Sequence, residues 1–150
     1  MVSRPVSATA TLPHAPPQIF EFLSDLRNHW RLEERFIELD DVTDHGGRVR
    51  VRGPLGLSRV ARTEVLEAEP PSPIGRLHGR AEIGRTTRGE VFWEIAPDDR
   101  GSRVTLTAVP ERLSASDAFL LALGGRRWMC RLFRTALERL DGVLKATERD

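Results

Sequence analysis

The side chains of this sequence that could do acid–base or metal chemistry are poorly spaced for it. The four histidines are isolated from one another: His14, His29, His45 and His78. We expect surface or capping roles for all four, and only His29, within Asn28-His29-Trp30, is placed to approach a ligand site. The neighbouring carboxylates of Glu33-Glu34 and Asp40-Asp41 point apart on a strand, which makes them poor general acid–base pairs. We therefore predict no catalytic residue and no metal ligand.

The remaining chemical motifs are also missing from the sequence. Cys130 is the only cysteine, which excludes an internal disulfide and a cysteine-based zinc site. No glycine-rich phosphate loop, nucleophile elbow or His-Glu-x-x-His motif occurs. We expect no cofactor, and the sequence leaves open whether any reaction is catalysed.

The arginines raise the possibility of a charged partner. Residues 45–89 contain nine arginines and four glutamates, a net charge of +5, whereas residues 31–44 have a net charge of −4. A basic sheet face can follow a phosphate backbone, but Phe92 is the single aromatic residue with the parity of that face. We therefore expect the two stretches to neutralise each other, and no nucleic-acid partner.

Length and composition predict one globular domain over residues 1–150. Hydrophobic residues make up 39% and charged residues 30% of the 150 residues, and the formal net charge is +1. The start of the chain does not resemble a signal peptide. No run approaches the ~20 apolar residues of a membrane-spanning helix. These features predict a cytoplasmic protein that does not insert into a membrane.

Hydrophobic periodicity divides the chain into helices and strands. Residues 6–12 alternate as a strand, and Pro16-Pro17 opens a short helix whose apolar face includes Ile19, Leu23, Leu26 and Trp30. Residues 36–109 read as six short strands separated by turn residues. Successive strands without intervening helices predict an antiparallel sheet.

A long amphipathic helix is predicted at the C-terminal end of the chain. Its apolar positions recur every three or four residues: Met129, Leu132, Phe133, Ala136, Leu137, Leu140, Val143 and Leu144. Ser114 or Ser116 can cap the helical region, and Gly124-Gly125 should divide it into residues 114–123 and 126–147. So broad an apolar face must lie against the apolar face of the sheet.

The strands alternate between apolar and charged residues, as expected for a sheet with one face in water. A turn at residues 45–47 would place two acid–base pairs on the charged face: Asp44 opposite Arg48, and Asp40 opposite Arg52. The same register turns Asp41 toward the apolar face.

Several landmarks together resemble the SRPBCC superfamily, which includes START domains, pollen-allergen-like proteins and polyketide cyclase/dehydrase-type proteins. They are Pro16-Pro17-x-Ile19-Phe20-x-x-Leu23-x-Asp25-x-x-Asn28-x-Trp30, Glu69-Pro70-Pro71, Gly101 to Thr107, and Trp128 to Leu140. The resemblance implies an α+β helix-grip fold. In that fold a curved antiparallel sheet of about seven strands wraps around a long C-terminal helix, and a short helical segment follows strand 1. It also implies a cavity between sheet and helix that holds a hydrophobic molecule.

We therefore expect the chain to bind a small hydrophobic, lipid- or polyketide-like molecule. The residues expected to line the cavity are Trp30, Leu39, Val51, Leu77, Ala81, Val91, Trp93, Leu106, Trp128, Met129, Phe133 and Leu137. One alternative is a polyketide cyclase or dehydratase, which a polar residue facing the cavity would favour; the candidates are Asp41, Arg62, Thr63, Glu64 and Thr87. A second alternative is an interaction module that uses the arginine-rich sheet face. A homodimer is left open.

Overall fold

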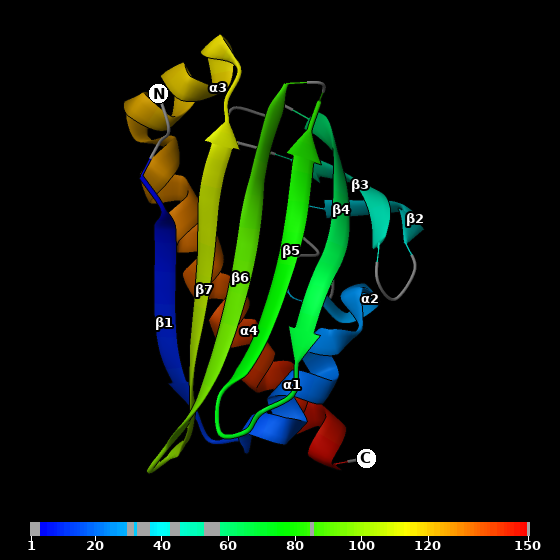
Figure 1. Ribbon diagram of the computed structural model, residues 1–150, viewed down its shortest axis with the longest axis vertical. Coiled ribbons are helices and arrows are strands. Elements are labelled where there is room, and N and C mark those ends of the chain that lie inside the picture. Colours follow the sequence, from blue (N-terminus) through cyan, green and yellow to red (C-terminus); the bar gives the residue numbers. More distant parts are fainter. Residues whose placement is uncertain are drawn as a thin grey trace.

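The computed structural model describes residues 4–29, 32, 37–42, 46–52, 58–84 and 86–149. Within them, strands β1 (Val6–Leu12), β2 (Ile37–Val42), β3 (Gly46–Arg52), β4 (Ser58–Glu69), β5 (Gly75–Ile83), β6 (Thr87–Asp98) and β7 (Gly101–Arg112) form a seven-stranded sheet. The strand order is β1-β7-β6-β5-β4-β3-β2, and every pairing is antiparallel. The predicted α+β helix-grip fold is confirmed (Figure 1).

The helices occupy one side of the curved sheet. Helices α1 (Pro16–Ser24) and α2 (Leu26–His29) follow β1, and α3 (Ala115–Leu120), η3 (Leu121–Gly125) and α4 (Arg126–Arg149) follow β7. Helix α4 crosses the concave face from the α3 end of the molecule to the end where α1 lies (Figure 1). No helix in these described ranges has the length and apolar character needed to span a bilayer.

Local sequence signals determine where the helices begin and bend. Helix α1 begins at Pro16-Pro17, as predicted, and the chain becomes extended at Asp25 before α2. Ser114 caps α3 by accepting the N–H of Asp117 at 3.2 Å. Gly124 has a φ of +114°, a conformation that favours glycine, so the helical region bends there before α4.

The hydrophobic core lies between α4, α1 and the concave face of the sheet. It contains Leu77, Trp93, Ile95, Val104 and Leu106 from the sheet, Ile19 and Leu23 from α1, and Phe133, Ala136, Leu137, Leu140 and Leu144 from α4. The predicted apolar face of the terminal helix is therefore the face that packs on the sheet.

The predicted register of β2 with β3 was wrong. Asp41, not Asp44, pairs with Arg48, and the register shifts between Leu39 and Asp41. The main cause is that Gly46 and Gly47, expected in the turn, already belong to β3 and pair with β4; the irregularity between Leu39 and Asp41 shifts the register by one more residue. Asp44 and the side chain of Asp41 lie outside what the structure describes.

A surface or capping role was also the wrong prediction for His14. Its side chain is 1% exposed, and its Nε2 lies 2.8 Å from Oδ1 of Asp141 on α4. The Ser102 hydroxyl donates to the His14 carbonyl at 2.6 Å. Residues about 90 and 130 positions away along the chain bury this loop histidine, so its own neighbours in sequence gave no signal.

Candidate functional site

The concave face of the sheet changes from fully buried to half-buried along its length. Residues paired directly across antiparallel strands point to the same face, so the register defines rows. The row Leu77, Trp93 and Leu106 is buried in the core. Closer to α3, two rows are half-buried, and we call them the open rows: Val65, Gly79, Val91 and Ala108, then Thr63, Ala81 and Gly89.

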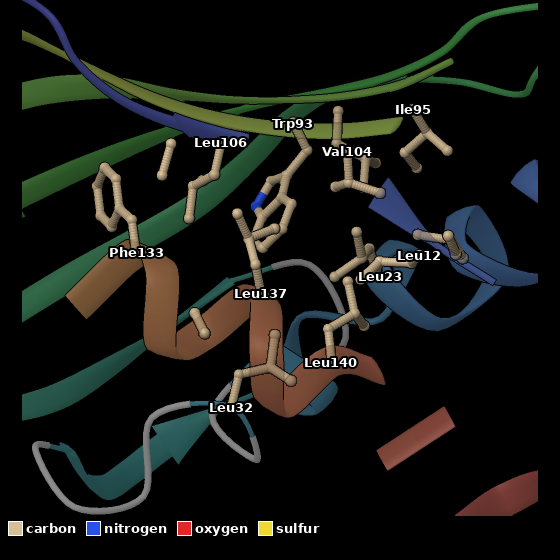
Figure 2. Packing of buried hydrophobic residues seen from close by; sticks show 14 of the residues in the cluster. Leu12, Leu23, Leu32, Trp93, Ile95, Val104, Leu106, Phe133, Leu137 and Leu140 are labelled. Carbon is tan, nitrogen blue, oxygen red and sulfur yellow. The ribbon is translucent and has the colours of Figure 1, made fainter. Parts of the chain in front are cut away.

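The position of α4 explains why the open rows are less buried. Among the strands, the backbone of α4 comes closest to β1, at one edge of the sheet. Side chains must therefore span the distance to the middle strands. Figure 2 shows Trp93 extending from the sheet toward Leu137 of α4, with Phe133 one turn earlier on the helix. In the open rows, the sheet offers only small or β-branched residues, so that part of the face is less completely filled.

Thr63 carries an unusual polar atom within the open rows. Thr63 pairs with Ala81 of β5, and Ala81 points to the same face as Gly79 and Leu77 of that strand. Thr63 therefore lies on the concave face. Its hydroxyl oxygen is buried and has no hydrogen-bond partner. A buried hydroxyl without a partner costs roughly 1–3 kcal/mol. A ligand that displaces the groups covering this atom would gain a hydrogen-bond partner.

His29 brings a titratable group against the core tryptophan. Its ring is edge-on to Trp93, with centroids 5.6 Å apart and planes at 74°. Its Nε2 donates to the Leu23 carbonyl at 2.6 Å. Burial lowers the pKa of His29, so its ring is neutral near pH 7, with the proton on Nε2 and a lone pair on Nδ1.

The residues expected to line a cavity fall into three groups. Leu77, Trp93, Leu106, Phe133 and Leu137 are buried in the core, and Ala81, Val91, Trp128 and Met129 are half-buried. Trp30 lies outside the described residues, as do the side chains of Leu39 and Val51. The half-buried residues of this set, with Thr63 and Val65, keep part of their surface exposed. The sequence pattern did not select Val65, because residues 60–68 do not alternate regularly between apolar and polar and so indicate no face.

The candidate polar residues lie on different faces of the sheet. Arg62 and Glu64 are exposed on the convex face, whereas Thr63 and Thr87 are on the concave side. The hydroxyl of Thr87 is already occupied, because it donates to the Asp117 carboxylate and accepts the N–H of Ser114 at 3.1 Å. Thr63 is therefore the member of this set whose hydroxyl has no hydrogen-bond partner. No group of three or more histidine, cysteine, aspartate and glutamate side chains in the described part of the chain is arranged to hold a metal ion.

Comparison with known protein families assigns the chain to a family. The model of the family described as polyketide cyclase/dehydrase and lipid transport matches residues 4–145. The chain belongs to this family. The SRPBCC resemblance is thereby confirmed over nearly the whole sequence. No curated protein matches the chain.

Solved structures share the fold of this polyketide cyclase/dehydrase and lipid transport family member at low sequence identity. TTHA0849 from Thermus thermophilus has a TM-score of 0.71 and 19% identity, covering 96% of this chain and 99% of that one. Ms6760 from Mycobacterium smegmatis has a TM-score of 0.67 and 16% identity, covering 96% and 97%. DynU16, a protein of the dynemicin biosynthetic locus, has a TM-score of 0.60 and 19% identity, covering 95% of this chain but 48% of its own. These similarities support the fold and assign no activity to this chain.

Proposed function

We propose that this protein binds a small hydrophobic, lipid- or polyketide-like molecule between α4 and the open rows of the sheet. The observation that carries the proposal is the half-buried state of apolar residues on the concave face, beneath a helix whose backbone approaches β1 instead of the middle strands. The family description, which names both polyketide chemistry and lipid transport, supports the same class of ligand.

The ligand should carry a polar atom as well as an apolar body. Burying about 300 Å² of apolar ligand surface at roughly 25 cal/mol/Å² gives about 7 kcal/mol. Lost rigid-body freedom removes at least about 4 kcal/mol of this, which leaves binding near the millimolar range. A hydrogen bond to the free Thr63 hydroxyl would strengthen binding about fivefold at ~1 kcal/mol. We therefore expect a hydroxyl, carbonyl or carboxyl group on the ligand.

Fluorescence titration with 2-naphthol and with oleic acid tests the proposal. Binding should change the tryptophan emission, and Trp93→Phe should remove most of that change because Trp93 borders the open rows. The salt dependence should be weak, because the contacts are mainly apolar. If neither probe binds at concentrations below millimolar, the proposal is wrong.

A variant that fills the site provides a second test. Ala81→Leu places a large side chain in the row beside Thr63 and should abolish binding of both probes. The control is Ala146→Leu, the same substitution at an exposed position of α4, which should bind as the wild type does. Thermal unfolding of both variants shows whether the fold is retained.

A polyketide cyclase-type enzyme is the second candidate function, and the contact of His29 with Trp93 favours it. The unprotonated Nδ1 of a neutral histidine can remove an α-proton from a diketone bound there. The resulting enolate carbon attacks the second carbonyl, and loss of water completes a cyclic enone. With 2,6-heptanedione as probe, the enone is followed by its ultraviolet absorbance. A rate equal to the buffer rate, or a His29→Gln rate equal to the wild-type rate, would exclude this role.

A further inference from the structure

The α3 end of the molecule exposes two large apolar side chains. Phe119 is 63% exposed and Leu123 is 68% exposed, more than any other large hydrophobic residue that is described. They are four residues apart, about one helical turn, and both belong to the short segment of residues 115–125. Contiguous exposed apolar side chains on a monomer commonly mark an interaction surface. We call residues 115–125 the apical segment.

A buried polar cluster holds the apical segment against the sheet. Asp117 is 7% exposed and accepts the hydroxyl hydrogen of Thr87 at the start of β6. The Ser114 N–H donates to Thr87 Oγ1 at 3.1 Å, and Ser114 Oγ accepts the N–H of Asp117 at 3.2 Å. The fold therefore ties the base of the segment to β6, while Phe119 and Leu123 remain exposed.

Several arginines lie at the same end of the molecule as the apical segment. Arg88 and Arg112 are exposed and directly opposite each other on β6 and β7, which is unfavourable for like charges unless an anion lies nearby. Arg127 is exposed at the start of α4. Arg126 donates to the carbonyls of Arg4 and Pro5, at 2.8 and 2.5 Å, which brings the start of β1 to this end. Figure 1 shows α3, the end of β7 and the start of β1 together.

The acidic groups described at this end offset only part of that positive charge. Glu111 lies 3.6 Å from Arg88, and Glu82 pairs with Arg88 across β5 and β6. Asp117 is the third acid, and it is buried against Thr87. Among the described residues, Glu111 therefore pairs with Arg88 rather than with Arg112 or Arg127.

We propose that the apical segment docks on the surface of an anionic lipid bilayer. Phe119 and Leu123 would enter the boundary between headgroups and acyl chains, and Arg112 and Arg127 would lie against lipid phosphates. A leucine beside a phenylalanine fits an acyl environment, whereas a nucleic acid favours aromatic side chains on which bases stack. The docking is peripheral and does not depend on the proposed ligand binding, although it would place the open rows of the same protein near a lipid source.

Sedimentation of the whole chain with lipid vesicles tests the proposal. Binding to phosphatidylcholine vesicles containing about 30 mol% phosphatidylglycerol should be at least tenfold tighter than binding to phosphatidylcholine alone and should weaken with salt. The double variant Phe119→Ser/Leu123→Ser should lose at least about tenfold in partition. Arg112→Gln and Arg127→Gln should each lose about fivefold.

The matched control is Leu66→Ser, which changes a 37%-exposed leucine on β4 outside the apical segment and should bind vesicles as the wild type does. Circular dichroism melting checks that each variant folds. The proposal is overturned if anionic vesicles do not bind, or if the double variant binds them normally. It is also overturned if oligonucleotides displace the vesicles at equal phosphate concentration. If light scattering shows that the wild type is a dimer and the double variant a monomer, the surface instead binds a second copy of the chain.

Discussion

Replacing Thr63 by valine separates the stability of the empty protein from its affinity for ligand. Valine has nearly the shape of threonine and a similar preference for strands, so the change mainly removes the unpartnered hydroxyl. A buried polar group without a partner costs roughly 1–3 kcal/mol. The hydroxyl oxygen of Thr63 is buried but the whole side chain is half-buried, which favours the low end. We expect Thr63→Val to stabilise the protein by about 1 kcal/mol, or roughly 2–4 °C in Tm for a chain of this size.

The same variant should bind polar ligands less well. Wild-type protein should prefer 2-naphthol to 2-methylnaphthalene, which has a methyl group in place of the hydroxyl, by roughly three- to tenfold. Thr63→Val should lose that preference, as measured by isothermal titration calorimetry. Thr107→Val is the control, because its hydroxyl is 3.1 Å from Ser7 Oγ on the convex face, and it should neither stabilise the protein nor alter the preference. A Thr63→Val protein that is destabilised, or that keeps the preference, would refute the reasoning.

Three further predictions concern the core, the contact of buried His14 with Asp141, and the backbone. Phe133 is 8% exposed within the core, so Phe133→Ala should cost about 3–5 kcal/mol in urea unfolding, and a loss below ~1 kcal/mol would contradict its placement. Asp141→Ala should cost about 1–3 kcal/mol near pH 7 because it leaves Nε2 of buried His14 without the carboxylate. Burial opposes ionisation of Asp141, but hydrogen bonds from His14 and Lys145 outweigh it and lower the pKa of this carboxyl below its ordinary value. The carboxylate therefore stabilises the fold fully above the ordinary pKa of an aspartate. The loss of unfolding free energy in Asp141→Ala should shrink as the pH falls through the lowered pKa. Measuring the unfolding free energy across acid pH tests this. Gly101 has a φ of +140°, and an added Cβ would collide with the Leu12 carbonyl oxygen, so Gly101→Ala should lower the thermal midpoint clearly. Gly142→Ala, in helix α4 with open space around it, should instead raise stability by about 0.5–1 kcal/mol.

Local patterns predicted most of the fold because the features they describe are local. The alternation of residues 87–112 requires only that one side of each strand be buried, and the three-to-four spacing of α4 requires only that one helix face be apolar. The cap at Ser114 and the bend at Gly124 likewise depend on one or two residues. These predictions hold without knowledge of what lies across the molecule.

The features that the sequence did not predict depend on contacts distant along the chain. Gly46 and Gly47 read as turn residues but pair with β4 as the start of β3, which moved the pairing of β2, and the irregularity between Leu39 and Asp41 shifts it by one more residue. His14 is buried because Asp141 and Ser102 converge on it. The free hydroxyl of Thr63 emerges only when the register of β4 with β5 is known, since periodicity could not give β4 a face. The sequence therefore named Thr63 among five polar candidates but could not select it.

The first two turns of α4 contribute differently from the rest of the helix. From Phe133 to Leu144 the apolar face is buried, and the Asp141–His14 pair adds a polar link to the loop after β1. In the first two turns, Met129 is only half-buried, and the helix starts at the bend of Gly124. Because buried contacts determine which segments open at high free energy, stability should reside mainly in the part of α4 after Leu132. We expect the first two turns, the open rows and the apical segment to change with the proposed ligand or membrane without unfolding the domain, an arrangement suited to a fold that serves many different ligands.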